Sequence, residues 1–183
     1  MIASRVKAVR HGPGRLVVDG RDTTITRKTK LSVSPSRRQE RELVACLDAT
    51  REVYNGGLQH RRDAWRTSGH AVTLYDQFSG PDSLTTIRQV RPDLYQWGLQ
   101  PLRGALRRLD EAYAAFFRRC AAGQTPGHPR FKGRSRWNTI MWDEPTGWKV
   151  DVDRRVVHVG GVGDIRLPKG SIRQQCRMLA RRR

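Results

Sequence analysis

The spacing of the apolar residues changes twice along this chain, and these changes constrain the fold more than any single motif. Between residues 3 and 33 the apolar residues stand in short runs with a period near two, which is typical of strands. Between residues 36 and 121 the spacing is three to four, as in amphipathic helices, and from about residue 137 it returns to two. Neither group of short strands could bury a face alone. The order therefore predicts an α+β fold, with a helical block inserted between short antiparallel strands.

The helical block begins at a clear local signal. Pro35 stops the preceding strand, which we expect over residues 23–34, and Ser36 with Gln39 forms a capping box. A seam with spacings of three and four then predicts one long helix that ends near Gly69: Leu43, Leu47, Thr50, Tyr54, Leu58, Arg61 and Trp65. Gly56 and Gly57 lie inside this helix, so either a neighbouring helix comes close there or the helix bends.

A second long helix is expected from Pro101 to about Gly123, after two short helical turns near residues 73–78 and 83–97. Its seam is equally regular: Leu102, Leu106, Leu109, Tyr113 and Phe116. The aromatic residues on or beside the two seams are expected in the core: Tyr54, Trp65, Tyr113, Phe116 and Phe117. Alternating residues from Trp148 onward predict short antiparallel strands with tight turns, up to residue 168.

The charge balance limits the partners. Lys and Arg number 36 against 17 Asp and Glu, a net charge of +19, which favours a polyanion such as nucleic acid as the partner. No apolar run approaches the roughly 18 residues of a membrane span, and the N-terminal residues lack the apolar region of a secretory signal. Three distant cysteines, Cys46, Cys120 and Cys176, support no zinc site or disulfide framework, and the first two are expected to be buried. These features predict a cytoplasmic protein without a membrane partner.

The sharpest local feature is the segment 127–137, GHPRFKGRSRW, which we call the basic segment. In an extended chain, residues two apart share a face, so four cations would form one basic row: Arg130, Lys132, Arg134 and Arg136. Phe131 would point the other way and anchor the segment to the core, and Trp137 would either stack on a base or pack. This pattern favours contacts with a nucleic-acid backbone; the alternative is a solvated loop.

Other candidate site residues are weaker. Arg103, Arg107 and Arg108 on the second long helix could add phosphate contacts, although Asp110 and Glu111 could simply pair with these arginines. The adjacent acids Asp143–Glu144 and the pair Asp151 and Asp153 do not converge from separate elements, as two-metal chemistry requires. Because no catalytic triad, phosphate-binding loop or cluster of metal ligands is present, we expect no catalytic residue, no metal site and no cofactor.

Several motifs resemble those of TnpB (OrfB-type) proteins of bacterial insertion sequences. The first two are Ser34-Pro35-Ser36 with Gln39-Glu40, and Arg51-x-Val53-Tyr54-Asn55-x-x-Leu58. The others are ALRRLDxAYxxFF at 105–117 and Gly127-x-Pro129-Arg130-Phe131-Lys132. The four motifs stand in the family's order within residues 24–172.

The resemblance implies more than the residues do by themselves. TnpB proteins are RNA-guided DNA endonucleases whose N-terminal half is a small wedge-type β-barrel interrupted by a helical recognition lobe, part of which is described as a helix-turn-helix. By this resemblance residues 23–172 are the TnpB-like region, with strands at 23–34, the helical lobe at 36–121, and the basic segment and further strands at 127–168. The partner is then RNA, DNA or both, held through phosphates by the basic segment.

The sequence also departs from the family. Residues 1–22 form a basic leader without a counterpart, and residues 173–183 a basic tail that does not resemble the expected strand. In the family, a RuvC-like nuclease domain with three metal-binding carboxylates follows this half, and its carboxylates do not occur here. We therefore expect no nuclease activity unless a separate chain supplies the nuclease half.

Three hypotheses follow. The first is a non-catalytic module that holds guide RNA or an RNA–DNA duplex. The second is a sequence-specific DNA binder, a repressor or transposon-end factor, whose helix presents Arg51, Asn55, Gln59 and Arg62 to the major groove. The third is a truncated transposase remnant without a biochemical role, or a protein-interaction partner that completes its barrel with a separate chain.

Overall fold

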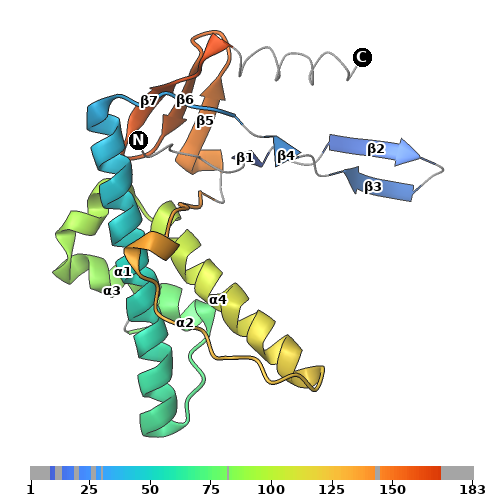
Figure 1. Ribbon diagram of the computed structural model, residues 1–183, viewed down its shortest axis with the longest axis vertical. Helices are drawn as coiled ribbons and strands as arrows, with labels where there is room; N and C mark the ends of the chain where they lie inside the picture. Colours follow the sequence, from blue (N-terminus) through green and yellow to red (C-terminus); the bar gives the residue numbers. More distant parts are fainter. Residues whose placement is uncertain are drawn as a thin grey trace.

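The structure is a computed structural model, and it describes residues 9–10, 14–18, 21–25, 28–29, 31–81, 83–142 and 145–169. In chain order, four short strands come first, then a block of helices, and then three more strands (Figure 1). This order agrees with the predicted α+β fold, in which the helices are inserted between strands.

The N-terminal strands pair with one another. Strand β1 (Val9–Arg10) pairs antiparallel with β4 (Lys28–Thr29), and β2 (Gly14–Val18) pairs with β3 (Arg21–Ile25). The single strand predicted over 23–34 is wrong in detail, because the pairing partner changes along it. β3 ends at Ile25, β4 covers only two residues, and Ser34 then forms a bridge with Arg166 near the other end of the described chain.

Helix α1 (Arg37–Ser68) is the longest element and agrees with the predicted helix at both ends. Ser36 caps it, and the reciprocal hydrogen bonds of a capping box join Ser36 and Gln39. At the other end, Gly69 takes the left-handed conformation that ends many helices. Both boundaries were predictable because they depend on residues within one turn of the helix end.

Three short helices and a second long one follow: α2 (Leu74–Ser79), α3 (Leu84–Val90), the 3₁₀ helix η1 (Pro92–Trp97) and α4 (Gln100–Ala121). Helix α4 buries the predicted leucine seam, with Leu102, Leu106 and Leu109 almost inaccessible. The chain then runs without regular structure to the short 3₁₀ turns η2 (Arg134–Arg136) and η3 (Pro145–Gly147).

Helices α1 and α4 pack closely at Gly57. A Cβ atom at Gly57 would lie 2.7 Å from Cδ2 of Leu106 and 2.9 Å from Nε2 of Gln77, so any larger residue would force these side chains to shift. Gly56 faces open space. Of the two explanations for the glycine pair, the close neighbouring helix is therefore the correct one at Gly57, and α1 continues unbroken through both residues.

The C-terminal strands form an antiparallel sheet in the order β5 (Trp148–Asp151), β6 (Val156–Val159) and β7 (Gly163–Arg166). The N–H of Ser34 donates to the carbonyl of Arg166 at 2.8 Å, and the amide of Gln39 donates to the carbonyl of Asp164 at 2.8 Å. These bonds fix the start of α1 against the edge of this sheet, as Figure 1 shows.

The core is continuous from the helices to this sheet. Val157, Val159 and Ile165 of the sheet belong to the same buried cluster as Trp97 of η1 and the leucines of α4. The strands form one three-stranded sheet, two two-stranded ones and the bridge at Ser34. Among the described residues they do not close into the wedge-type barrel that the resemblance implied.

Candidate nucleic-acid interface

The basic segment lies along α1 and runs in the opposite direction (Figure 1). Arg62 donates through Nη2 to the carbonyl of Pro129 at 2.7 Å, near the C-terminal end of the helix. Farther along the segment, Arg134 forms an ion pair with Asp48, with 3.1 Å between Nε and Oδ1. Between residues 62 and 48, α1 rises by about 20 Å, at 1.5 Å per residue. The segment is therefore supported over much of its length.

Asn55 makes the central contact of this support. Its Oδ1 accepts a hydrogen bond from the backbone N–H of Lys132 at 2.8 Å, and its Nδ2 donates to the carbonyl of the same residue at 3.0 Å. The side-chain amide of Asn55 thus bonds to both the N–H and the carbonyl of Lys132, as the backbone of a neighbouring β-strand would. Both polar backbone groups of Lys132 are satisfied, and the segment is fixed in position against α1.

Trp137 anchors the C-terminal end of the basic segment in the core. Its side chain is only 4% exposed, its Nε1 donates to Oγ1 of Thr50 at 3.0 Å, and its ring lies 5.0 Å from that of Tyr54. The guanidinium of Arg108 covers the ring at 3.9 Å from its centroid. Of the two roles considered for Trp137, packing is the one observed, and its ring is not accessible to a base.

The basic side chains differ in how they are presented. Arg130, Arg134 and Arg136 are exposed, whereas Lys132 is partly buried, with Nζ 5.9 Å from the centroid of Tyr54. The alternation of an extended chain does not continue past Gly133, because Arg134–Arg136 form the 3₁₀ turn η2. The four residues belong to one supported segment. The prediction that they form a single row along one face of an extended chain is wrong.

Phe131 does not anchor the segment, contrary to the prediction. It is 46% exposed, and the guanidinium of Arg62 lies 4.9 Å from its centroid. Pro129 and Trp137 are the buried residues of the segment. The arginine on the helix surface supports the ring, so that its outer part stays accessible.

The predicted arginines of α4 separate into two environments. Arg103 lies against Phe78 of the α2 helix, 5.4 Å from the ring centroid, and Arg107 is half-buried. Arg108, on the same helix, donates to the carbonyl of Thr139 at 2.9 Å and covers Trp137. Burial lowers its pKa. Sequence reasoning considered Arg108 for phosphate contacts and Arg62 for base reading, but it did not predict that both residues support the basic segment. Asp110 pairs with Arg61 of α1, with 2.9 Å between Nη2 and Oδ1.

The helix face proposed for reading a major groove is occupied in this structure. Asn55 and Arg62 bind the backbone of the basic segment. Arg51 pairs with Asp48 at 3.3 Å, and Gln59 donates to Asp63 at 2.8 Å. These four side chains therefore interact within the protein, and two of them hold the segment that carries the exposed cations.

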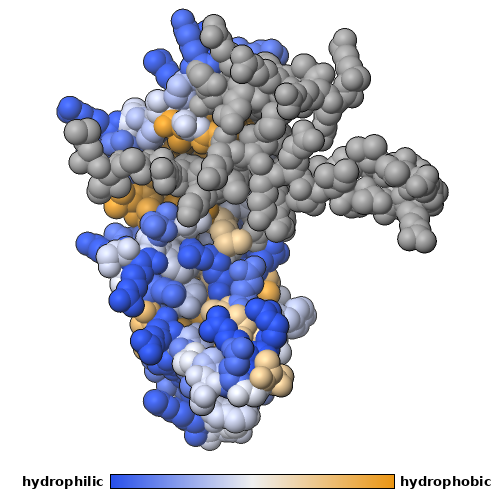
Figure 2. All heavy atoms as spheres, turned by 45° about the vertical axis from the view of Figure 1, so that its right-hand side comes forward, coloured by the Kyte–Doolittle hydropathy of each residue, from blue (hydrophilic) through white to orange (hydrophobic). Residues whose placement is uncertain are grey.

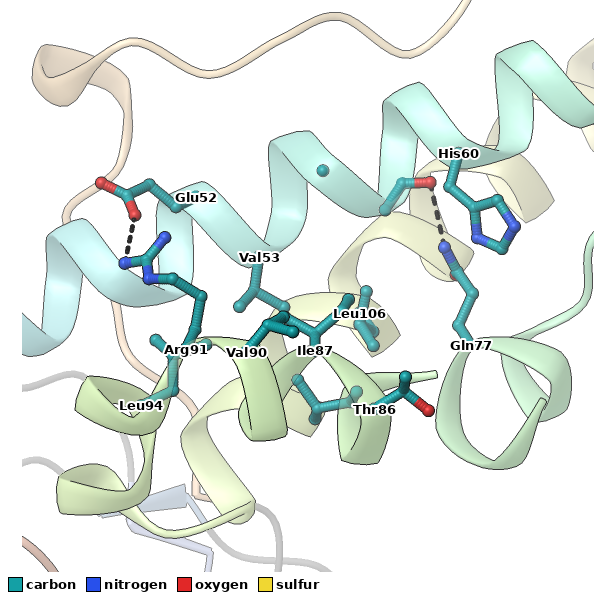
Figure 3. A pocket seen from close by; sticks show the side chains of 13 residues that line it. Glu52, Val53, His60, Gln77, Thr86, Ile87, Val90, Arg91, Leu94 and Leu106 are labelled. Atoms are coloured by element: carbon teal, nitrogen blue, oxygen red, sulfur yellow. Dashed lines mark hydrogen bonds and ion pairs between the residues drawn. The ribbon is translucent and has the colours of Figure 1, made fainter. Parts of the chain in front are cut away.

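A pocket of about 430 Å³ lies between α1 and α3, on a different part of the helical block (Figure 3). Val53, Leu84 and Ile87 give it an apolar lining, and the ion pair between Glu52 and Arg91, 3.2 Å long, lies at one end. At the other end, Gln77 donates to the carbonyl of Gly57 at 2.9 Å. These groups are paired, and His60 and Thr86 add further polar side chains to the lining.

Metal ligands and thiols are scattered. Among the residues that the structure describes, no three His, Cys, Asp or Glu side chains lie together as a metal site would require. Asp143 and Glu144 lie outside the described residues, and Asp151 accepts from the backbone N–H of Arg154 in a turn. Burial raises the pKa of Cys46 to about 12.

Cys46 is buried as predicted, and the prediction for Cys120 is wrong, because its thiol is exposed near the end of α4. Cys176 lies outside the described residues. No helix within the described ranges is long and apolar enough to span a membrane.

Figure 2 shows hydrophilic side chains over most of the coloured helical surface, with small apolar patches between them.

In a comparison with known families, residues 25–70 match the helix-turn-helix domain family of IS605-type OrfB proteins, which confirms the resemblance to OrfB over that stretch. The matched stretch contains the whole of α1 as one continuous helix, and the turn to α2 follows it at residues 69–73. No curated protein matches the chain. Helix-turn-helix domains of transposases bind DNA, so the match indicates a nucleic-acid-binding domain of transposase type.

Proposed function

We propose that this protein is the nucleic-acid-binding portion of a TnpB-like transposon protein. It would hold guide RNA or an RNA–DNA duplex through phosphate contacts, without a catalytic site of its own. The observation that carries the proposal is the attachment of the basic segment to α1. Hydrogen bonds from Asn55 and Arg62 fix its backbone, and Arg130, Arg134 and Arg136 remain exposed.

Rigid support makes these cations better phosphate ligands than the same residues on a solvated loop. The backbone of the segment is already ordered in the free protein, so binding does not incur the entropy loss of ordering it. Arginine also presents a planar set of donors that matches a phosphate group. A net charge of +19 adds a long-range attraction for any polyanion.

Contacts to phosphates fit the structure better than base reading by the same helix face. Base readout would require Asn55 and Arg62 to leave the basic segment, and Lys132 would then lose both partners of its peptide groups. Phosphate contacts by Arg130 and Arg136 require no such change, and Arg134, whose side chain is 79% exposed, would exchange only its ion pair with Asp48 for a phosphate. Binding would therefore depend weakly on sequence and strongly on salt.

The second candidate is a sequence-specific DNA binder that acts as a repressor or at transposon ends. The helix-turn-helix match over residues 25–70 favours it. Footprinting on transposon-end DNA separates the two candidates: one protected site in the presence of excess bulk DNA supports this candidate, and uniform weak protection supports phosphate binding.

The main test removes the exposed cations of the basic segment. We expect R130A/R134A/R136A to weaken binding of a labelled single-stranded RNA and of an RNA–DNA duplex. On the single strand the slope of log affinity against log salt should shrink by roughly 0.7 for each phosphate that the variant no longer neutralises. The measurement is fluorescence anisotropy at several salt concentrations.

The matched control is R154A/R166A/K169A, which removes three exposed cations from the C-terminal sheet and its end. Both variants lose the same net charge. If the two variants lower the slope equally, only the overall charge matters, and the basic segment has no special role. A larger decrease for the segment variant is the expected result.

A further inference from the structure

A group of aromatic rings lies at the C-terminal end of α4, where the basic segment begins. Tyr113 stacks on Phe117 at 6.1 Å between centroids, and Phe117 meets Phe116 edge to face at 5.2 Å. His128, from the start of the basic segment, stacks on Phe116 at 4.3 Å. We call these four residues the ring cluster.

The ring cluster is partly open to solvent: Tyr113 and Phe116 are half-buried, and Tyr113 packs against the core, whereas Phe117 was expected in the core and is exposed. Phe117 is 61% exposed, and His128 is exposed as well. Phe131, three residues after His128, is the next exposed ring of the segment, supported by Arg62 of α1. A group of exposed rings on a hydrophilic surface commonly marks a binding site.

Cations stand next to these rings in the chain. Arg118 and Arg119 follow Phe117 directly and are exposed, and Arg130 lies between His128 and Phe131 in the chain. Asp110, an acid of α4 one turn before Tyr113, is held by Arg61. A ligand that suits this surface carries both flat rings and negative charge.

We propose that the ring cluster and Phe131 stack unpaired bases of a single-stranded nucleic acid whose phosphates contact Arg118, Arg119 and Arg130. This inference rests on the proposed function and deepens it, because it selects single strands over duplexes. In a duplex the faces of the bases are covered by their neighbours, whereas an unpaired base offers its face to an aromatic side chain. An apolar protein partner would gain nothing from the neighbouring cations.

The test compares two labelled 15-nucleotide probes with the same phosphates, one of thymidine and one of abasic sites. We expect the protein to bind the thymidine probe about tenfold more tightly in fluorescence anisotropy, since stacking adds to phosphate binding. The substitution F117A/F131A should reduce this ratio to near one and leave the affinity for the abasic probe unchanged. Both side chains are largely exposed, so the variant should fold.

The matched control is Y75A, which removes a 74% exposed ring from α2, outside the ring cluster. It should retain the tenfold ratio. A ratio near one in the unaltered protein would overturn the inference while leaving phosphate binding intact, and would leave the rings for a partner of another class. Failure to bind either probe would overturn the proposed function as well, and the two failures are thereby distinguished.

Discussion

Asn55 shows how one side chain positions a functional surface. It lies in the middle of α1, where it neither reads a base nor faces solvent freely, and both ends of its amide bind the peptide groups of Lys132. Asn55 and Lys132 belong to two different motifs and are 77 residues apart in sequence, and the two motifs meet in this contact. Residues of the two motifs therefore form one contact between α1 and the basic segment.

We expect N55A to loosen the basic segment. The variant leaves the N–H and carbonyl of Lys132 without partners in a partly buried place, which should lower the free energy of unfolding by about 1–3 kcal/mol. Trypsin should also cleave after the cations of the segment more rapidly. Urea unfolding and timed proteolysis measure the two effects.

The control for this prediction is Q59A, one turn farther along α1, where the exposed side chain bonds only to Asp63. It should change stability and cleavage little. Equal cleavage rates for N55A and the unaltered protein would show that other contacts, such as those of Arg62 and Trp137, hold the segment without Asn55.

The burial of single aromatic residues was the least predictable part of the site. Trp65 continues the apolar seam of α1 at helical spacing, yet it is 64% exposed. Figure 1 shows that α1 and α4 diverge toward their C-terminal ends, so the last part of each seam has no partner helix against it. Phe117 is exposed for the corresponding reason near the end of α4. Trp137 lies in an irregular segment and is buried. Periodicity shows which side of a helix a residue occupies, but the angle between the two helices decides how far that side is covered.

At the scale of elements, the helices could be predicted and the strand partners could not. Ser36, Thr73 and Ser83 each cap a helix by accepting a hydrogen bond from a residue three positions later, and such signals are local in sequence. Strand pairing joins distant residues, such as Ser34 and Arg166, and no local pattern specifies it. The helical block was therefore predictable, and the division of the 23–34 strand was not.

The glycine pair in α1 provides an internal comparison. G56A should raise the free energy of unfolding by roughly 0.5–1 kcal/mol, because alanine favours the helix and no atom lies within 4 Å of its Cβ. G57A should lower it by about 1–2 kcal/mol, because the new Cβ overlaps with Leu106 in the core and overpacking outweighs the gain in helix propensity. Chemical denaturation measures both.

The sign of the difference between the two adjacent variants is the test. Should both alanines stabilise the protein, Leu106 and Gln77 can move aside, and α1 and α4 do not require glycine at their crossing. The pocket between α1 and α3 borders Gly56. A residue larger than alanine at position 56 would therefore also show whether that pocket can be filled without lowering the free energy of unfolding.

At the scale of the whole molecule, two electrostatic effects of opposite sign act on stability. A net charge of +19 destabilises the folded chain through self-repulsion, which salt screens. A bound nucleic acid neutralises part of the same charge and stabilises the fold, but salt weakens that binding. The two effects should be separable in one experiment, since only the second requires a ligand.

We expect the melting temperature of the free protein to rise between 50 and 200 mM salt, and that of the complex to fall toward it. With a single-stranded oligonucleotide at about 100 times its Kd in low salt, binding should add about 2.7 kcal/mol. For a domain of this size that corresponds to a rise of roughly 5–11 °C in melting temperature. Differential scanning fluorimetry with and without the oligonucleotide measures both curves. Two curves that stay parallel as salt increases would mean that the ligand binds through contacts other than the phosphates, because phosphate binding must weaken as the released counterions become more concentrated.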